Sequence, residues 1–322
     1  MTARISVLVP SYNYGSRIGA CLDSVLAQRH PSLELVVSDD ASTDDSDAVI
    51  RRRPDSRVVY QRQTTNLGMV PNWRRCVELS SGEYLLLLGA DDYLKPGMLE
   101  QCAAVLDSDP DVALCHTAVE LFTEPGRVVS ITGAFQRSYV RPGDELVEGF
   151  LRGKRVVSSS SLFRRRCFVE LGGWSEEYRN CMDLDLWFRM LLRWKVGYVG
   201  KILVGFRSHP VSTDWTVMQA EEDLRFLRSM FARLPPRLAH LQAIEPTLVR
   251  DLCTERRATL AALPPAAGRD RVVALLSVYA DKHAVAPPSW WSGLRLALRR
   301  RAAFYLARLP DQLRYRVGDW SG

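Results

Sequence analysis

The sequence predicts an α/β fold, with a mostly parallel central sheet flanked by helices and a helical appendage at the C-terminus. Apolar, β-prone runs alternate with helical patterns in the first part of the chain, and this order is typical of parallel strands joined by right-handed crossovers. After residue 215, helical segments are separated by proline pairs, which are natural helix ends. We therefore expect residues 1–214 to form one domain and residues 215–322 a helical C-terminal region.

The composition is that of a folded protein with a sizeable core. The chain has 322 residues, of which 47% are hydrophobic and 25% charged. No apolar run reaches the roughly 18 residues of a membrane span, and the N-terminus shows no signal-peptide pattern, so we expect a cytoplasmic protein. The seven cysteines are scattered without a C-x-x-C pair, which argues against disulfides and zinc. The net charge of +6 permits nucleotides, anionic lipids or nucleic acid as partners without choosing among them.

Two β-loop-α units open the chain, and each combines an apolar strand, a loop and an amphipathic helix. The predicted strand, loop and helix are residues 4–10, 10–15 and 18–26 in the first unit and 33–38, 39–45 and 48–52 in the second. A third strand at 57–61 and a helix at 71–79 follow. The sequence contains neither a G-x-G-x-x-G fingerprint nor a P-loop, so nucleotide binding would use another kind of loop.

The next strand ends in two adjacent carboxylates, around which the rest of the chain is organised. Leu85 to Leu88 are apolar without alternation, which predicts a strand buried on both faces of a parallel sheet. Asp91 and Asp92 then lie at its carboxyl end, where open α/β sheets bind ligands, so a metal-bound phosphate could be held there. A simpler interpretation is that the pair shapes a turn and caps the following helix. Taken alone, the pair favours that simpler interpretation.

The second part of the domain mixes short strands and helices. Runs at 112–115, 118–122 and 128–132 predict a hairpin, and residues 144–151 predict a short helix. Residues 156–163 are predicted to form a strand, in which a run of serines supplies small polar side chains rather than catalytic hydroxyls. The remaining predicted elements are a helix from residue 182, a strand at 197–207 and C-terminal helices at 217–234, 246–263 and 268–282.

A series of short motifs carries a family resemblance. In chain order they are VPSYN (9–13), SDDASTD (38–44), NLG (66–68), Asn72, GEY (82–84), ADD (90–92), LGGW (171–174), MDLDLW (182–187) and RSHP (207–210). Their order and spacing resemble those of glycosyltransferase family 2 over roughly the first two-thirds of the chain. The resemblance implies a GT-A fold, with nucleotide-sugar binding at 1–110 and an acceptor side at 111–214. It also implies a nucleoside-diphosphate sugar, rather than nucleic acid, as the acidic partner.

The resemblance implies a set of donor-binding residues in the first half. Pro10 and Tyr12 would line the nucleobase pocket, and Asp39 would accept hydrogen bonds from base N–H groups, a role that suits an acceptor-only carboxylate. The other nucleotide-sugar-binding positions implied in this way are Asn13, Asn66, Gly68, Asn72 and Asp91, the last of them through the ribose or the waters of a metal.

The resemblance also implies a bound Mg²⁺ or Mn²⁺. Asp92 would be its direct ligand at an exposed strand end, since these cations prefer oxygen ligands and take part of their shell from substrate phosphate. His209 matches a position near the donor diphosphate, where it would ligate the metal or contact phosphate; the alternative is a structural histidine. The sequence departs from the family pattern at Gly89, where many members carry the first Asp of the D-x-D signature.

Asp183 is the catalytic residue that the resemblance implies, as the general base of an inverting hexosyltransferase. It would remove the proton of an acceptor hydroxyl during direct displacement at the anomeric carbon. The other interpretation is a carboxylate that stabilises the start of a helix. Met182 replaces the usual Glu of the family motif, and Asp185 is expected on another face of the helix, where it would serve as a control for mutagenesis.

Two classes of function follow from these residues. The leading hypothesis is a metal-dependent inverting glycosyltransferase that acts on a sugar, lipid-linked or small-molecule acceptor in the synthesis of cell-surface polysaccharide, glycolipid or another glycoconjugate. Gly89 and Met182 motivate the alternative, a catalytically silent nucleotide-sugar binding or scaffold protein. Residues 290–309 predict a basic amphipathic helix, which would either contact the inner face of the cell membrane peripherally or pack on the protein.

Overall fold

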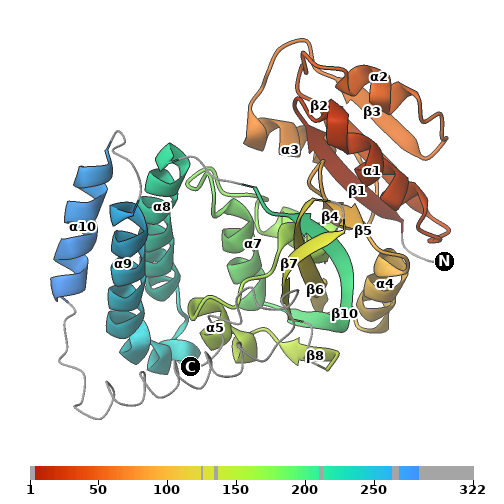
Figure 1. Cartoon of the computed structure of the whole chain (residues 1–322). Coiled ribbons are helices and arrows are strands. Elements are labelled where there is room, and N and C mark those ends of the chain that lie inside the picture. The colour runs from red at the N-terminus through yellow and green to blue at the C-terminus, as the bar shows by residue number, and fades with distance from the viewer. Residues whose placement is uncertain (1–3, 125, 134–136, 210–212, 263–267, 283–322) are drawn as a thin grey trace, which may run out of the picture.

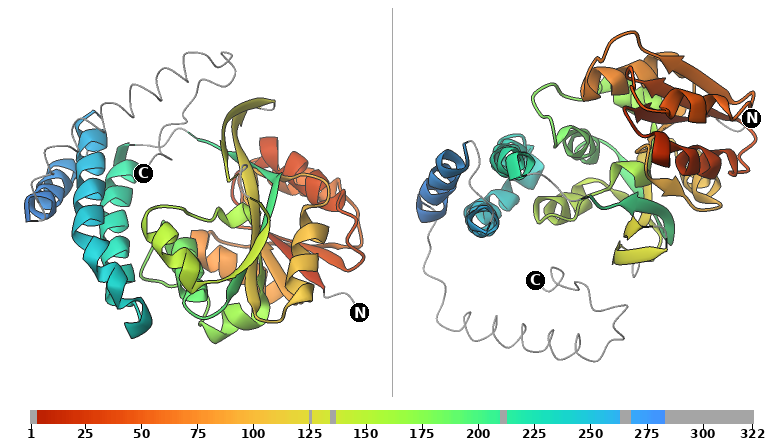
Figure 2. Two further views of the ribbon diagram at one scale, coloured as in Figure 1. Left: turned by 90° about the horizontal axis from the view of Figure 1, so that it is seen from below. Right: turned by 45° about the horizontal axis from the view of Figure 1, so that its top comes forward.

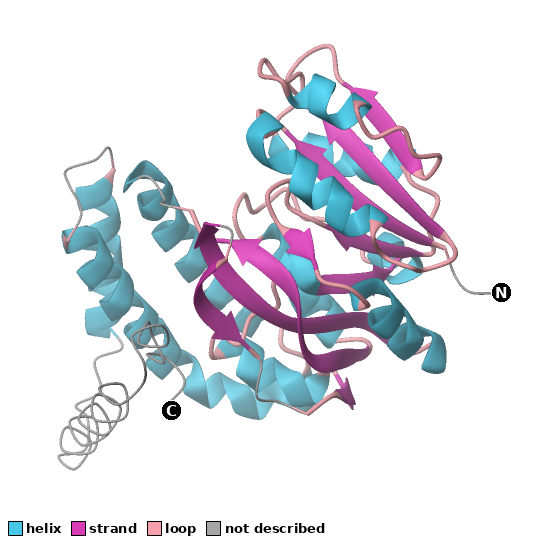
Figure 3. Cartoon of the chain, turned by 45° about the vertical axis from the view of Figure 1, so that its right-hand side comes forward, coloured by secondary structure: helices cyan, strands magenta, loops and turns pink. Residues whose placement is uncertain are grey.

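The computed structural model describes residues 4–124, 126–133, 137–209, 213–262 and 268–282, and these form a mixed sheet with helices on both faces (Figure 1). The strand order is β3-β2-β1-β4-β9-β6-β10-β5, while β7 pairs with β6 and β8 with β10. Figure 3 shows how strongly the sheet twists between its first strands and the long strands β6 and β10. The predicted α/β class, with a mostly parallel sheet, is confirmed.

The first half is a run of parallel strands joined by helices, as predicted. The strands are β1 (Ile5–Ser11), β2 (Leu33–Asp39), β3 (Val58–Arg62) and β4 (Tyr84–Leu87), and the helices are α1 (Gly15–Leu26), α2 (Ser46–Arg51) and α3 (Met69–Leu79). In β1, Val7 and Val9 pack in the cluster that contains α1, while Leu8 packs in the cluster that contains Cys76 of α3. The strand is therefore apolar without alternation because helices cover both of its faces.

The parallel register brings the carboxyl ends of these strands to one edge of the sheet. Ser11 at the end of β1 is paired with Asp39 at the end of β2, and Asp39 is paired with Arg62 of β3. On the other side of β1, Leu8 is paired with Leu87, the last residue of β4. The loops that carry the first three motifs and the Asp91-Asp92 pair consequently start from neighbouring positions.

The second half adds one further parallel pair of strands and several antiparallel strands to this sheet. Its elements are β5 (Tyr93–Leu94), α4 (Met98–Ser108), β6 (Val112–Glu124), β7 (Arg127–Thr132), β8 (Tyr139–Pro142), α5 (Asp144–Leu151), β9 (Ser161–Arg164), α6 (Arg165–Glu170), α7 (Met182–Leu191) and β10 (Lys195–Arg207). The predicted hairpin is confirmed as β6 and β7, but the runs at 112–115 and 118–122 are one strand rather than two. His116 and Thr117 between them continue the pairing with β10, so no break occurs.

The strand predicted at 156–163 is shorter than expected. Residues Ser158–Ser160 form a 3₁₀ turn, η1, and β9 begins only at Ser161. The hydroxyl groups of Ser160 and Ser161 both donate to the carbonyl oxygen of Val157, at 2.8 Å, and hold the chain in the turn. Local side-chain bonds of this kind compete with strand pairing, which explains the wrong prediction.

The C-terminal region is helical, as predicted, with α8 (Thr213–Ala232), the 3₁₀ segment η2 (Pro236–Ile244), α9 (Glu245–Ala261) and α10 (Arg269–Lys282). Figure 2 shows α8, α9 and α10 side by side, on the side of α7 that faces away from the first strands. Apolar residues of α7 and α8 belong to one buried cluster, so the region shares a core with the domain before it. No helix among the described residues is long and apolar enough to cross a bilayer, and the predicted helix at 290–309 lies outside them.

Candidate active site

The loops after β1 and β2 are tied together by side chains of the predicted donor-binding set. Asn13, which has a φ of 58°, receives at its side-chain oxygen a hydrogen bond from the backbone N–H of Thr43 at 2.8 Å, and its own N–H donates to Ser42 Oγ at 2.9 Å. Tyr12 beside it is exposed, and Pro10 is half-buried. The structure therefore gives Asn13 an organising part in the loops and leaves the ring of Tyr12 open to a ligand.

Asp39 is fully buried at the end of β2, and its two carboxylate oxygens have different surroundings. Oδ1 accepts hydrogen bonds from the backbone N–H of Ser42, at 3.0 Å, and from the Ser42 hydroxyl. Oδ2 has the longer contacts, 3.3 Å to the hydroxyl of Tyr60 and 3.6 Å to Nε of Arg62. Oδ2 is therefore the oxygen with acceptor capacity left for another donor.

The turn at Asn66 to Gly68 is brought to the same edge by Asp40. The carboxylate of Asp40 accepts hydrogen bonds from the backbone N–H groups of Leu67, at 2.7 Å, and Gly68, at 2.9 Å. Gly68 has a φ of 88°, which favours glycine. Asn72 is buried one turn into α3 and donates through its side-chain amide to the carbonyl of Ser38 at 3.1 Å. Its side-chain oxygen has no hydrogen-bond partner among the described residues.

Asp91 and His209, 118 residues apart in the sequence, are in direct contact after β4. Nε2 of His209 lies within hydrogen-bonding distance of Oδ2 of Asp91, and Nε of Arg207 is 3.8 Å from the same oxygen. The side chain of His209 is 38% exposed and that of Asp91 is 9% exposed. A carboxylate and an imidazole therefore meet at the surface of the ligand-binding edge.

Asp92 is 3% exposed, so the expected exposed strand end is wrong for this residue. Its Oδ1 accepts a hydrogen bond from the backbone N–H of Arg207 at 2.8 Å, and its Oδ2 accepts one from the hydroxyl of Ser159 at 2.5 Å. Burial raises the pKa of Asp92 to about 7, although both hydrogen bonds favour the ionised form. The residue joins β10 and η1 to the end of β4 from inside the protein.

Asp183 lies in the first turn of α7 and is half-buried. Its Oδ1 accepts a hydrogen bond from the backbone N–H of Leu184 at 2.8 Å. Burial raises the pKa of Asp183 to about 6, against the opposing effects of that hydrogen bond and the charge of Arg155. A carboxylate with this pKa is ionised at neutral pH and is a stronger base than an ordinary aspartate.

Comparison with known proteins decides the family. Residues 6–172, more than half of the chain, match the profile described as Glycosyl transferase family 2. The chain belongs to glycosyltransferase family 2. An uncharacterized protein of Mycobacterium tuberculosis is 31% identical to it over 235 residues, which are 67% of this chain and 70% of the relative. Chondroitin synthase of Escherichia coli is 24% identical over 69% of this chain, which spans only 31% of that enzyme.

Solved structures show that this glycosyltransferase has the GT-A fold. S. aureus TarS in complex with UDP-GlcNAc matches it with a TM-score of 0.63 and 17% identity, over 85% of this chain and 79% of that chain. Mannosyltransferase PcManGT from Pyrobaculum calidifontis, in complex with GDP-Man and Mn²⁺, matches with a TM-score of 0.56 and 20% identity, over 95% of this chain and 88% of that chain. The fold expected from the motifs is thereby confirmed.

The glycosyltransferase accommodates its glycine at position 89 by packing Asp92 into the free space. A Cβ atom on Gly89 would lie 2.7 Å from Oδ2 of Asp92 and 3.5 Å from Oδ1 of Asp91. The backbone N–H of Gly89 donates to the Ser159 hydroxyl at 3.2 Å, and the same hydroxyl donates to Asp92. A third carboxylate at this position would have to displace the arrangement that buries Asp92.

Met182 and Asp185, on either side of Asp183, face away from solvent. Met182 is buried in the apolar cluster of α7 and α8, an environment that suits its side chain. Asp185 is also buried, where its two oxygens accept hydrogen bonds from Nε of Arg189, at 2.7 Å, and from Arg233, at 2.6 Å. Asp185 does face another side of the helix, as expected, but it is a structural ion pair and is unsuitable as a neutral control for mutagenesis.

Sequence reasoning missed the residues that hold these motifs in place. Asp40, Ser159 and Glu222 each bridge two segments. Asp40 lies within a family motif and Ser159 within the serine run, but neither pattern indicated a bridging role. Glu222 of α8 accepts hydrogen bonds from the backbone N–H groups of Arg179, Asn180 and Cys181, at 3.1, 2.6 and 2.8 Å, and thereby fixes the residues that lead into α7. No signal in the sequence indicated this role, because the burial of Glu222 follows from the fold.

Proposed function

We propose that this enzyme is a metal-dependent, inverting glycosyltransferase that moves a hexose from a nucleoside-diphosphate sugar to an acceptor hydroxyl in glycoconjugate synthesis. The observation that carries the proposal is the contact between Asp91 and His209, because it joins two family motifs at the ligand-binding edge of the sheet. Similarity to a chondroitin synthase supports a role in the assembly of polysaccharide or related glycans. The cytoplasmic location and membrane contact through residues 290–309 stay predictions.

The donor would bind across the carboxyl ends of β1, β2 and β4. The base would lie against Tyr12 and Pro10, with its N–H groups donating to Oδ2 of Asp39, the oxygen that has acceptor capacity left. Asn66 and Gly68 belong to the turn that is fixed by Asp40, the residue directly after Asp39. Nucleotide-sugar complexes of the TarS and PcManGT structures support a donor of this class.

The residues present fit a divalent cation that is shared with the substrate. The described residues contain no group of three or more His, Cys, Asp or Glu side chains placed to hold a metal by themselves. Asp91 and His209 supply one oxygen and one nitrogen at the surface, and a diphosphate would complete the shell. We therefore propose Asp91, rather than Asp92, as the direct ligand of the metal, with His209 beside it. Both oxygens of Asp92 already accept hydrogen bonds from the protein. When bound, Mg²⁺ or Mn²⁺ would neutralise negative charge on the leaving diphosphate.

Asp183 is the proposed base for the acceptor. In a direct displacement, the acceptor oxygen forms a bond to the anomeric carbon while the bond to the diphosphate oxygen breaks and its electron pair leaves with the diphosphate. The hydroxyl proton goes to the carboxylate of Asp183, whose raised pKa suits this transfer. Attack from the face opposite the leaving group inverts the configuration at that carbon.

The silent-scaffold alternative rests on Gly89 and Met182, and the structure explains both without loss of the proposed machinery. Gly89 leaves room for buried Asp92, and Met182 fills an apolar site. Asp91, His209 and Asp183 all remain accessible to a ligand to some degree. We therefore favour the enzyme.

A thermal-shift screen of UDP-, dTDP- and GDP-sugars with and without Mn²⁺ tests this proposal. Ligands that bind the folded state raise the melting temperature, so one nucleotide class should stabilise the protein, and more strongly with the metal. The matching sugar nucleotide should then be consumed with release of the nucleoside diphosphate. Binding without turnover over a broad acceptor panel would favour the scaffold, and no stabilisation by any donor would contradict both functions.

A further inference from the structure

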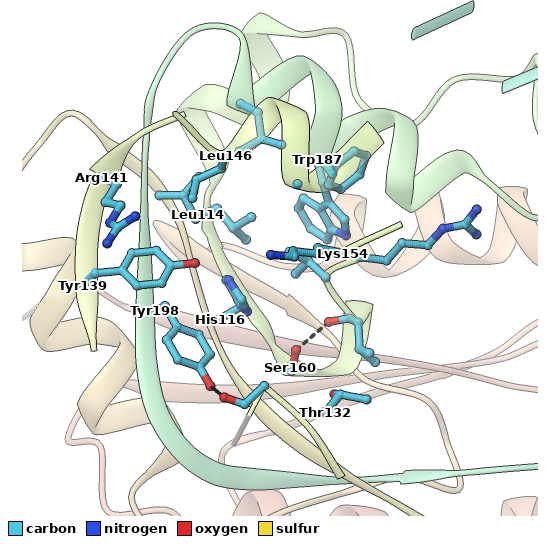
Figure 4. A pocket seen from close by; sticks show the side chains of 18 of the residues that line it. Leu114, His116, Thr132, Tyr139, Arg141, Leu146, Lys154, Ser160, Trp187 and Tyr198 are labelled. Carbon is cyan, nitrogen blue, oxygen red and sulfur yellow. Dashed lines mark hydrogen bonds between the residues drawn. The ribbon is translucent and has the colours of Figure 1, made fainter. Parts of the chain in front are cut away.

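A cavity of about 810 Å³ lies on the acceptor side of the sheet, between β6, β8, β10 and helices α5 and α7 (Figure 4). Aromatic side chains form much of its floor. The rings of Tyr139 and Tyr198 are stacked, with centroids 5.3 Å apart and planes inclined by 30°, and the ring of His116 lies 4.9 Å from Tyr198. The volume is that of a pocket for a small organic ligand, and flat rings of this kind pack well against the C–H faces of a sugar.

Trp187 gives this cavity a buried polar group without a partner. The side chain is 0% exposed and lines the cavity, and its Nε1–H has no hydrogen-bond partner among the described residues. Figure 4 shows the indole beside the cavity, across from Tyr139 and Tyr198. A buried donor left unpaired is costly, so an acceptor oxygen brought by a ligand would stabilise it.

Positive charge gathers at the opening of the cavity. Five basic and two acidic side chains belong to its lining: Arg137, Arg141, Arg152, Lys154, Arg155, Glu145 and Glu148. Glu148 pairs with Arg152 at 2.9 Å, and Arg155 lies 3.5 Å from Asp223. In the described part of the chain, Lys154 and Arg141 form no ion pair, and both are exposed.

The opening keeps a net positive charge: among the described lining residues outside ion pairs, Glu145 is the one acidic side chain, against Arg137, Arg141 and Lys154. Burial lowers the pKa of His116 to about 4, so its ring is neutral at physiological pH and adds hydrogen-bonding capacity without charge. Figure 4 shows Lys154 extending toward the centre of the cavity, on the opposite side from Arg141 and Tyr139. An anionic group on a ligand would therefore meet cations from two sides.

The walls of the cavity are continuous with the proposed catalytic groups. Trp187 lies one helical turn after Asp183, about 6 Å along the axis of α7. Arg155 lines the cavity and is also the charged side chain that acts on the pKa of Asp183. On the other wall, Ser160 follows Ser159, which donates to Asp92.

We propose that this cavity binds the acceptor, and that the acceptor is a glycan carrying a phosphate or carboxylate group. One sugar ring would pack against Tyr139, the less buried of the two stacked rings, because Tyr198 is enclosed by Tyr139 and His116. An oxygen of the glycan would accept from Trp187. The anionic group would lie between Lys154 and Arg141, whose guanidinium is 5.1 Å from the centre of the Tyr139 ring. This assignment rests on the proposed transferase function, since it places the acceptor hydroxyl near Asp183. The anionic group can belong to a uronic acid, a sugar phosphate or a prenyl-diphosphate-linked sugar.

Direct binding to the intact protein tests the cavity without requiring turnover. Titration calorimetry would compare a neutral methyl glucoside with the methyl glucuronide, glucose 6-phosphate and a short-chain prenyl-diphosphate glucose. At least one anionic probe should bind about tenfold more tightly than the neutral one, and added salt should reduce that difference. The probe that gains most identifies the source of the charge.

Two cavity variants and one control locate the effect. Lys154→Met with Arg141→Gln should remove the preference for the anionic probe while the affinity for the neutral probe changes little. Tyr139→Ala should weaken both. Lys201→Met is the matched control, because Lys201 is an exposed lysine of β10 outside the cavity whose ammonium group bonds only Gln101, at 2.8 Å, among the described residues. It should retain the preference, and melting temperatures would show that all variants fold.

Equal affinity for neutral and anionic probes in the unmodified protein, or an anionic preference that survives in the double variant, would overturn the proposal. So would an anionic glycan that binds in the cavity without competing with the acceptor in the transfer reaction. Donor binding and donor hydrolysis, measured in the same preparations, report on the transferase function separately. If donor binding and hydrolysis are absent while the charge-dependent binding is present, the proposed transferase function is wrong. The cavity would then still be a binding site for an anionic glycan, but not for an acceptor.

Discussion

The proposed donor half (residues 1–110) and the proposed acceptor half (residues 111–214) of this enzyme hold their candidate functional side chains by different means. In the donor half, the loops after β1 and β2 are held by bonds between neighbouring motifs, such as that from Thr43 to Asn13. In the acceptor half, the residues before α7 are held by Glu222, which lies 41 residues after Cys181 in a different helix. The loops of the proposed nucleobase pocket are therefore held by residues of the first two β-loop-α units, whereas the position of Asp183, the proposed base, depends on the C-terminal region.

Helix α8 connects the C-terminal helices to the catalytic domain. Arg233, just after α8, pairs with Asp185 of α7, and Asp223 of α8 receives hydrogen bonds from Arg256 of α9. α8 is thus connected to the helix of the proposed base on one side and to the rest of the appendage on the other. We expect changes in α8 to affect catalysis more than donor binding, and the following predictions test that separation.

The largest expected effect is that of Asp183→Asn. The change keeps the size of the side chain but removes the base, so kcat should fall by about 10² to 10⁴ while the donor dissociation constant changes little. Asp270→Asn is the matched control, because Asp270 occupies the first turn of α10 and its side chain is 91% exposed. Initial-rate kinetics and donor titration on the same samples would measure kcat and the donor dissociation constant. If Asp183→Asn weakened donor binding as much as it lowered kcat, the proposed separation of donor binding from catalysis would be wrong.

Asp91→Asn and Asp92→Asn should differ in the donor half. If Asp91 is the direct ligand, its loss should weaken Mn²⁺-dependent donor binding by more than about tenfold. Asp92→Asn should retain most of that dependence, since Asp92 is buried and hydrogen-bonded within the protein. Donor titrations at several Mn²⁺ concentrations measure both variants. A larger loss of Mn²⁺-dependent donor binding in Asp92→Asn than in Asp91→Asn would show that Asp92 is the direct ligand of the metal.

Glu222→Gln should have a smaller, selective effect on catalysis. The amide group of Gln cannot accept all three backbone N–H groups that the carboxylate accepts, so the residues before Asp183 should loosen. We expect kcat to fall about tenfold with unchanged donor affinity, in line with the loss of charge-assisted hydrogen bonds. The neighbouring Glu221→Gln is the control, because the side chain of Glu221 is only partly buried and pairs only with Arg271 among the described residues. Loss of donor binding in Glu222→Gln would mean that α8 supports both halves.

Sequence patterns predicted the donor half well because its signals are local. Apolar runs located β1 to β4, and turn-forming residues located the loops. Three of these strands, β1, β2 and β4, are buried along almost their whole length and therefore read as continuous apolar runs. The exposure of Asp92 could not be predicted, because it is buried by Ser159 and the backbone of Arg207, from elements 67 and 115 residues away. A different limit applies to η1, where local side-chain bonds to Val157 override the strand propensity of the flanking residues.

In the acceptor half, patterns located α7 and Asp183 but not what supports them. The burial of Asp185 follows from two arginines, one of them 48 residues later, and helical periodicity alone gave only the face on which it lies. The cavity beside α7 likewise combines residues of seven elements, so no single segment of the sequence predicts it. The family motifs predicted which residues lie at the site, whereas their burial and charged neighbours could be seen only in the folded structure.

The pH dependence of kcat at saturating donor and acceptor tests most directly whether half-buried Asp183 is the base. Because burial raises its pKa to about 6 and the base acts when ionised, log kcat should rise with a slope near one below pH 6 and level off above about pH 7. The residual activity of Asp183→Asn should lack this inflection. A wild-type rate that does not change between pH 5 and 7, or an inflection that persists in Asp183→Asn, would contradict the account.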